Sequence, residues 1–445
     1  MRSSRPAPSA AGRATERALW IAIYVVLILA PLAFLAVAPA GEDSDDGLVA
    51  VALGFVAITV MALQVVIASR AAPFTSPFGF SRLIRFHRLA GLLAAVLIVA
   101  HVVAVVAGED DRLSWLHPLD APLAGRLGQA AVLLIALLTL TALWRRTLRI
   151  PYELWRGLHV ALSLGAIALA FGHVLAVSRF SQTGTIRWLT LGFVVSALVG
   201  AFYLRVARPF LATRRPYRLT RSIRETDGSV TLKFAALGHP GAVFAPGQFA
   251  WLKPASAPYA LTEHPFSYAS SAHAPERPSF TVKPIGDFTS ALERLVEGER
   301  MLIDGPHGAP ALIDTDDHVL IAGGSGITPA ISVLRTAAEE DDPRRLLLLY
   351  FVRDEATAAL REELQALGQQ KSIQVTIVPS RPDEDWPGPS GRLDVKLLDS
   401  LLPANRERWS YFVCGPPGMV DTAEAALGGL AIDSARVRVE RYRLA

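Results

Sequence analysis

Cysteine is almost absent from this chain, which has 445 residues and a single cysteine, Cys414. One thiol excludes disulfide bonds within the chain, and it also excludes an iron–sulfur cluster held by four protein cysteines. Any redox centre in the protein must therefore be an organic cofactor or a metal bound by histidine.

Charged side chains are scarce over long stretches of the first half of the chain. Six apolar runs follow one another at about residues 19–38, 48–68, 83–107, 127–144, 154–177 and 186–204. Each has roughly the 17–25 residues that an α-helix needs to cross the hydrocarbon core of a bilayer. The first run is too long for a signal peptide and lacks a small-residue cleavage site. The sequence therefore predicts six transmembrane helices, after a disordered tail at 1–18 that is rich in Pro, Ala, Ser and Arg.

Basic residues are missing from alternate loops between these runs. Arginines cluster before the first run, between the second and third, between the fourth and fifth, and after the sixth. The loop at 41–47 has no basic residue, and the loop at 108–126 has only Arg112 and Arg126. By the positive-inside rule, both termini are cytoplasmic. The net charge of +4 is then mostly a topology signal, and we expect no nucleic-acid partner.

The third and fifth apolar runs each contain two histidines at the same spacing. His87 and His101 lie in the third run, and His159 and His173 lie in the fifth. The shared separation is about 14 residues, which on an α-helix is a rise of about 21 Å and a return to nearly the same face. An ionisable side chain inside a bilayer is costly, so these histidines are candidate functional residues. The first two runs carry no ionisable residue at their centres and are interpreted as scaffold.

The third and fifth helices are both odd-numbered and would run parallel. His87 would then lie level with His159 near the cytoplasmic face, and His101 with His173 nearer the outer face. Two levels of facing imidazoles suit two haem b groups, each ligated at both axial positions. Alternatively, each histidine forms a hydrogen bond to a backbone or hydroxyl group inside the bundle. The duplicate spacing on parallel helices favours haem ligation.

The second half of the chain lacks long apolar runs. Short alternating segments lie at 230–237, 247–254, 264–270 and 279–284, with Pro and Gly between them. Regularly spaced short strands predict a small antiparallel β-barrel. From about residue 317, buried strands alternate with helices, which predicts an α/β nucleotide-binding domain.

The turn after the first of these buried strands is rich in glycine and reads GGSGITP from Gly323 to Pro329. Its backbone N–H groups are free at the start of a helix, which favours a pyrophosphate by geometry and dipole. Glycines alone are a weak signal, because strand–helix turns often carry them for steric reasons. The signal becomes strong when HPFS (264–267) and CGPPG (414–418) occur with it in this order.

Several motifs together resemble the ferredoxin–NADP reductase type of flavoprotein. They are HPFSYAS (264–270), IGDFT (285–289), DGPHG (304–308), AGGSGITP (322–329), YFVRD (350–354) and CGPPGM (414–419). Because a six-helix domain with paired histidines precedes them, the chain from about residue 19 onward resembles the ferric reductase / NADPH oxidase superfamily in its compact bacterial form. The resemblance implies a six-helix transmembrane haem bundle at 19–207, an FAD-binding antiparallel β-barrel domain at 208–314 and an NAD(P)H-binding α/β domain at 315–445.

The resemblance also implies a role for each motif. The residues along the flavin ring are His264, Pro265, Phe266 and Ser267, and those at the FAD pyrophosphate are Gly286, Asp287, Phe288 and Thr289. The NAD(P)H pyrophosphate loop comprises Gly323, Gly324, Ser325, Gly326, Ile327 and Pro329, with the Thr328 hydroxyl reaching the nicotinamide. Cys414, Gly415 and Pro416 lie beside the site of hydride transfer, although Cys414 has the alternative interpretation of a buried packing residue at a strand end.

Two positions bear on nucleotide choice and on the flavin. Arg353 matches a basic position associated with a 2′-phosphate, so NADPH is favoured, while Asp354 and Glu355 beside it keep NADH open. The family often ends with an aromatic residue that stacks on the flavin. Here the candidate, Tyr442, lies shortly before the C-terminal Ala445.

The function implied is transmembrane electron transfer in a bacterial plasma membrane. Cytoplasmic NAD(P)H would reduce FAD, and electrons would pass through two haem b groups to an extracytoplasmic one-electron acceptor such as a ferric chelate or dioxygen. One alternative is a dedicated superoxide-producing NADPH oxidase. Another is a membrane module that delivers electrons to a partner protein or to quinone, and the sequence does not choose among these acceptors.

Overall fold

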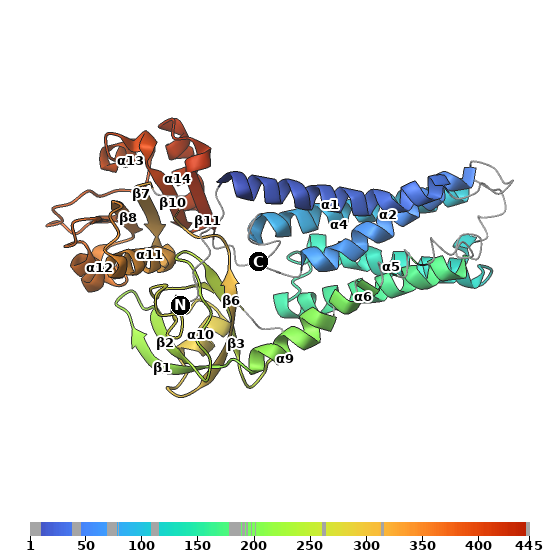
Figure 1. Cartoon of the computed structure of the whole chain (residues 1–445), viewed down its shortest axis with the longest axis horizontal. Coiled ribbons are helices and arrows are strands. Elements are labelled where there is room, and N and C mark those ends of the chain that lie inside the picture. The colour runs from blue at the N-terminus through green and yellow to red at the C-terminus, as the bar shows by residue number, and fades with distance from the viewer. Residues whose placement is uncertain are drawn as a thin grey trace. The chain divides into compact units, whose positions relative to one another are not determined.

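The computed structural model describes residues 10–37, 46–68, 80–107, 115–177, 202–259, 264–312 and 316–441, with Phe78 and isolated positions between 188 and 200. The chain divides into two compact units, Met1–Arg208 and Pro209–Ala445. The first is helical, and the second contains both β-sheets (Figure 1).

The first unit contains long apolar helices, each long enough to span a membrane. They are α1 (Ala10–Val37), α2 (Asp46–Ile67), α4 (Phe80–Ala107), α5 (Leu123–Trp144) and α6 (Tyr152–Ala176). Together they make the chain a multi-pass membrane protein. The predicted sixth span at 186–204 falls mostly outside the described residues. The prediction of a disordered tail is wrong for residues 10–18, because α1 begins at Ala10 and its first turns precede the apolar run.

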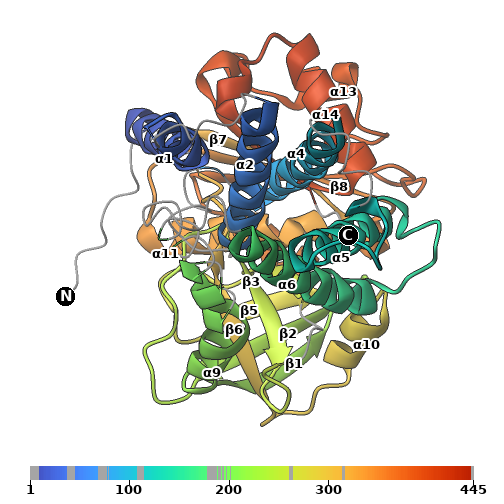
Figure 2. The same ribbon diagram turned by 90° about the vertical axis from the view of Figure 1, so that its right-hand side faces the viewer.

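The helices of the first unit pack mainly as two pairs. Helix α2 lies along α4, and α5 lies along α6 (Figure 2). Beyond these pairs the unit ends in a short π-helical turn, η2 (Tyr203–Ala207), which leads into α9 (Arg208–Thr213).

The second unit begins with a six-stranded antiparallel sheet in the order β4-β3-β6-β1-β2-β5. Its strands are β1 (Tyr217–Arg224), β2 (Val230–Ala236), β3 (Phe249–Pro254), β4 (His264–Ser267), β5 (Ser279–Val282) and β6 (Arg300–His307), and α10 (Asp287–Glu293) lies between β5 and β6. Leu232, Phe234 and Phe280 are buried in its core. The predicted antiparallel sheet is confirmed, while its closure into a barrel stays a prediction.

A five-stranded parallel sheet follows in the order β11-β10-β7-β8-β9. Its strands are β7 (His318–Gly323), β8 (Leu346–Val352), β9 (Ile373–Pro379), β10 (Ser410–Gly415) and β11 (Val437–Arg441). The helices are α11 (Ile327–Glu340), α12 (Arg361–Leu367), α13 (Val395–Leu401) and α14 (Pro417–Gly429). This arrangement confirms the predicted α/β domain.

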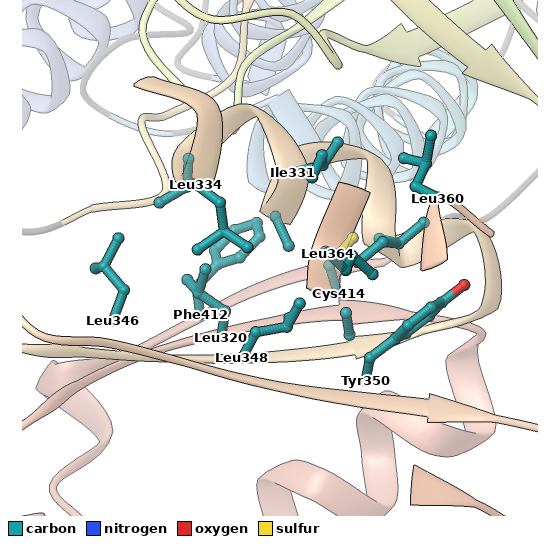
Figure 3. Close-up of a cluster of buried hydrophobic side chains, with 14 of the residues drawn as sticks. Leu320, Ile331, Leu334, Leu346, Leu348, Tyr350, Leu360, Leu364, Phe412 and Cys414 are labelled. Atoms are coloured by element: carbon teal, nitrogen blue, oxygen red, sulfur yellow. The ribbon is translucent and has the colours of Figure 1, made fainter. Parts of the chain in front are cut away.

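Both faces of the parallel sheet are covered, which explains why its strands are apolar without alternation. On one face, Leu320, Leu348 and Phe412 pack with Ile331 and Leu334 of α11 (Figure 3). On the other face, the neighbouring strand residues pack with α13 and α14. The strand order reverses between β7 and β10, and ligands of open α/β sheets bind at the carboxyl ends of the strands at such a reversal.

Arg335 of α11 ties the two sheets of the second unit together. Its guanidinium donates to both carboxylate oxygens of Glu363 at 2.6 Å and to the carbonyl oxygen of Ala269 at 2.6 Å. Glu363 lies in α12, so the bidentate ion pair fixes the Arg335 side chain, and the hydrogen bond to Ala269 joins α11 to the segment that follows β4.

Candidate functional site

Helices α4 and α6 bring the four histidines together in two pairs. The ring centroids of His87 and His159 are 6.1 Å apart, and those of His101 and His173 are 6.2 Å apart. The ring planes cross at 60° in the first pair and at 78° in the second. These are the pairs expected from equal spacing on parallel helices, and each presents two imidazoles across a gap of nearly the same width.

The width of that gap fits one metal ion between two imidazoles. A metal held at about 2 Å from each nitrogen, with roughly 1.1 Å from each nitrogen to its ring centre, separates the centroids by roughly 6 Å. In the part of the chain that the structure describes, no cluster of three or more His, Cys, Asp or Glu side chains could hold a metal. Two facing imidazoles at this spacing are the protein ligands that a haem iron takes in bis-histidine sites.

Hydrogen bonds to backbone carbonyl oxygens orient the rings of the His101–His173 pair. Nδ1 of His101 lies 2.6 Å from the carbonyl oxygen of Ala50, and Nδ1 of His173 lies 2.8 Å from that of Ala124. A carbonyl oxygen only accepts, so each Nδ1 carries the proton and each Nε2 keeps a free lone pair. That is the tautomer that a metal requires. Helix α2, interpreted from the sequence as scaffold, therefore contributes directly to the site through Ala50.

Aromatic and basic side chains surround the other pair. The Trp155 ring centroid lies 5.0 Å from that of His159, one helical turn away on α6. The Arg145 guanidinium lies over the rings of Tyr152 and Trp155, at 5.4 Å and 5.7 Å from their centroids. This is cation–π geometry, and it places a fixed positive charge near His159. The i, i+4 spacing of Trp155 and His159 was the signal in the sequence that could have revealed the contact.

The two predicted flavin motifs meet in the antiparallel sheet. His264, Pro265, Phe266 and Ser267 form β4, and Gly286, Asp287, Phe288 and Thr289 form the start of α10. The Phe288 ring lies 4.5 Å from that of His264 and stacks at 6.3 Å on that of Phe266. The Thr289 hydroxyl accepts from the N–H groups of Ile285 and Gly286, which fixes the turn. The motifs thus form one continuous surface.

The glycine turn between β7 and α11 is shaped largely by packing. A Cβ on Gly323 would lie 2.0 Å from Sδ of Met419, and a Cβ on Gly326 would lie 2.1 Å from the carbonyl oxygen of Cys414. Sterics therefore account for two of its glycines. Gly324 differs, because it has a φ of +51° and open space where a Cβ would be.

Only part of the predicted nucleotide loop is available to a ligand. Gly324 is partly exposed and Ser325 is exposed, whereas Ile327, Thr328 and Pro329 are buried in the first turn of α11. The Thr328 hydroxyl donates to the carbonyl oxygen of Ser325 at 2.9 Å, so it closes the turn. Within the predicted loop, the accessible backbone is therefore that of Gly324 and Ser325.

The end of β10 lies against this turn. Cys414 is fully buried and packs in the core cluster with Leu348, Leu364 and Tyr350 (Figure 3). This position agrees with the alternative interpretation of Cys414 as a packing residue at a strand end. Gly415 packs against Gly323, and Pro416 precedes α14, so the β10 and β7 termini form one compact edge.

Glu440 is a residue of this edge that sequence reasoning did not select. It pairs in register with Cys414 across the parallel strands β10 and β11. Glu440 keeps part of its surface accessible, yet burial raises the pKa of its carboxyl to about 8. The side chain therefore keeps its proton at neutral pH. Its place between Val439 and Arg441, in a strand where charged and apolar residues alternate, gave no clear signal in the sequence.

The remaining predicted positions lie apart from this edge or outside the described residues. Arg353 follows β8 and is exposed, and its carbonyl oxygen accepts from the backbone N–H of Arg381 at 2.8 Å. Its guanidinium is therefore at the surface beside the carboxyl ends of the strands. Tyr442 is among the residues that the structure does not describe.

Two family models match the chain, one in each unit. Residues 53–170 match the ferric reductase like transmembrane component, and residues 320–425 match the oxidoreductase NAD-binding domain. The first match contains His87, His101 and His159 and ends just before His173. The second contains the glycine turn and Cys414. Both parts of the resemblance stated from the sequence are thereby confirmed.

Curated relatives match the second unit. The ferredoxin reductase component of 3-ketosteroid-9-alpha-monooxygenase from Rhodococcus rhodochrous is 29% identical over 227 residues, which are 49% of this chain and 62% of the relative. NADH-cytochrome b5 reductase 1 from Candida glabrata is 31% identical over 147 residues, which are 32% of this chain and 52% of the relative. The matches thus cover less than two thirds of these relatives.

A flavohemoglobin from Malassezia yamatoensis, solved with bound FAD and heme, has a similar structure. Its TM-score is 0.46 at 20% identity, over 80% of this chain and 97% of that one. At such a TM-score, likeness alone does not indicate a shared function. The two family models by themselves show that the chain combines a ferric reductase-like transmembrane component with an oxidoreductase NAD-binding domain.

Proposed function

Because one chain carries a ferric reductase-like transmembrane component together with an oxidoreductase NAD-binding domain, we propose that it is a flavocytochrome b oxidoreductase of the ferric reductase / NADPH oxidase type. It passes electrons from cytoplasmic NAD(P)H through FAD and two b-type haems to a one-electron acceptor outside a bacterial plasma membrane. The observation that carries this proposal is the presence of two facing imidazole pairs in α4 and α6.

The histidines hold the haems in this proposal. His87 and His159 ligate an inner haem b, and His101 and His173 ligate an outer one. Each haem supplies a one-electron redox centre within the lipid layer. The four histidines would hold the two groups, the backbone carbonyl oxygens of Ala50 and Ala124 would orient the rings of His101 and His173 through Nδ1, and the apolar helices would exclude water.

The second unit binds the two organic cofactors. The surface formed by β4 and the start of α10 holds FAD, which lets a two-electron hydride donor feed one-electron centres. The exposed Gly324–Ser325 backbone binds the NAD(P)H pyrophosphate, and the Cys414–Pro416 segment lies by the nicotinamide. The buried thiol shapes this edge by packing, and Arg353 favours the 2′-phosphate of NADPH.

The domain boundaries and orientation are part of the proposal. A transmembrane domain at 19–207 with a sixth helix at 186–204 precedes an FAD domain at 208–314 and an NAD(P)H domain at 315–445. Arginines beside the described helices support cytoplasmic termini, since Arg82, Arg85 and Arg88 are at one end of α4 and Arg145 and Arg146 end α5.

Three versions of the proposed function differ in the electron acceptor. Purified protein with NADPH and FAD would reduce ferric chelates without oxygen if it is a ferric reductase. Cytochrome c reduction sensitive to superoxide dismutase would indicate a dedicated superoxide-producing oxidase. Reducible haem with neither activity would indicate a module for a partner protein or quinone.

The electron path itself is tested by one spectrum. We expect an NADPH-reduced minus air-oxidised visible spectrum to show b-type haem bands only when FAD is present. Pyridine haemochrome quantitation should give about two haems per chain, one for each histidine pair. Absence of haem would overturn the proposal and leave a membrane-tethered flavin reductase.

A further inference from the structure

Helices α2 and α5, which pack against the two helices that carry the paired histidines, contain the same short motif near their N-terminal ends. It is Ala-x-x-x-Gly, at Ala50–Gly54 in α2 and at Ala124–Gly128 in α5. The carbonyl oxygen of each alanine accepts from Nδ1 of a histidine in the next helix of its pair, His101 or His173.

The glycine of each motif lies against the same imidazole. A Cβ on Gly54 would lie 3.0 Å from both Cε1 and Nδ1 of His101. A Cβ on Gly128 would lie 3.0 Å from Nδ1 and 3.3 Å from Cε1 of His173. A methyl group at either position would displace the ring by roughly a few tenths of an ångström from the position in which it meets its carbonyl partner.

We propose that Gly54 and Gly128 are positioning residues that hold the outer histidine pair in its ligand geometry. The inference rests on the proposed function, in which His101 and His173 hold the outer haem. Each glycine lets an imidazole approach the carbonyl of the alanine one helical turn earlier. That hydrogen bond fixes the ring plane and makes Nε2 a stronger electron donor, which favours oxidised iron.

A competing role for these glycines is close helix packing, since small residues one turn apart bring membrane helices together. The chain offers a matched control for that role. A Cβ on Gly165 of α6 would lie 3.0 Å from Cδ1 of Leu134 in α5, the same crowding without a histidine. A Cβ on Gly91 of α4 would meet no atom within 4 Å, so Gly91→Ala tests alanine alone.

The inner pair provides an internal reference. His87 lies beside the backbone of Gln64, close to the opposite end of α2 from Ala50. The two backbone positions are separated by about 21 Å along the helix, so crowding at Gly54 leaves the inner ring undisturbed. Helix propensity does not explain a loss either, because alanine exceeds glycine as a helix former by about 1 kcal/mol.

Low-temperature EPR of the oxidised protein reads the ring planes directly. In low-spin ferric haem, crossed imidazole planes act on different iron d orbitals, so their effects cancel and the largest g value is high. The 78° angle of the outer pair predicts such a signal. A turned ring lowers that g value, and a weakened hydrogen bond raises the midpoint potential, by about 59 mV for each tenfold loss in preference for ferric iron.

The experiment compares Gly54→Ala, Gly128→Ala, Gly165→Ala and Gly91→Ala in the full-length protein by EPR, redox titration and haem content. We expect the first two to shift the outer g value and potential, or to lose the outer haem alone, with the other two unchanged. Equal effects in Gly165→Ala would overturn the inference, and so would the absence of any effect in Gly54→Ala and Gly128→Ala. In either case, two haems in the wild-type protein would still support the proposed function. A wild type without haem would overturn both.

Discussion

Glu440→Gln should remove the fall in stability of the second unit that this one carboxyl causes as the pH rises from 5 to 8. The native carboxyl keeps its proton up to about pH 8, because burial raises its pKa from 4.5 to about 8. In the unfolded chain the same group releases its proton near its ordinary pKa. Between these two values, only the native state binds the proton, so the free energy of unfolding falls as pH rises.

The size of this effect follows from the two pKa values. Stability is greatest below the unfolded pKa, falls by about 1.4 kcal/mol per pH unit, and levels off above pH 8, a total of about 5 kcal/mol. Glutamine is neutral at every pH and of similar shape, so the variant lacks this slope. At pH 5 the two proteins should be similarly stable, and at pH 8 the variant should be the more stable.

The assay is thermal unfolding of the full-length protein in detergent, followed by flavin release from pH 5 to pH 9. Even half of the expected free energy moves the Tm by roughly 5–10 °C for a unit of this size. Subtracting the Tm of the variant from that of the wild type at each pH cancels the contribution of all other titrating groups. Parallel Tm curves for the two proteins between pH 5 and pH 8 would refute the reasoning.

Three further substitutions test the proposed electron path. His101→Leu should halve the pyridine haemochrome yield while NADPH still reduces the flavin, and an unchanged haem content would contradict the ligand assignment. Gly324→Trp should abolish NAD(P)H-driven flavin reduction but leave dithionite reduction intact, because it fills the open face of a turn with φ +51°; normal turnover would place the nucleotide elsewhere. Arg353→Ala should raise the KM for NADPH by roughly 10–100-fold, the value of one charge-assisted hydrogen bond, and equal effects on NADH would argue against a 2′-phosphate contact.

Hydropathy and histidine spacing were enough to predict much of the membrane domain. Both depend on helix geometry alone, since length sets a span and a separation close to a whole number of turns returns to one face. The helix pairing, however, depends on tertiary packing that no single apolar run encodes. For that reason α2 was interpreted as scaffold, although its Ala50 carbonyl holds His101.

The second unit shows the same division between local pattern and long-range contact. Strand–helix alternation predicted the parallel sheet, because strands that are buried on both faces are continuous apolar runs that can be recognised in the sequence. The apolar run before Cys414 allowed its burial to be anticipated, but the pairing of Glu440 with Cys414 was not predictable from neighbours in sequence. It arises because β11 joins β10 in the sheet, a pairing between segments that the whole of α14 separates along the chain.

The hydrogen bonds of His101 and His173 divide the bundle into two parts. Each bond links two helices of one packed pair, α2 with α4 or α5 with α6, whereas each histidine couple spans the two pairs. The orientation of each ring therefore depends on contacts within its own helix pair, while the distance between the facing rings depends on how the two pairs pack together. A substitution between the pairs can thus change the width of the gap without turning either ring.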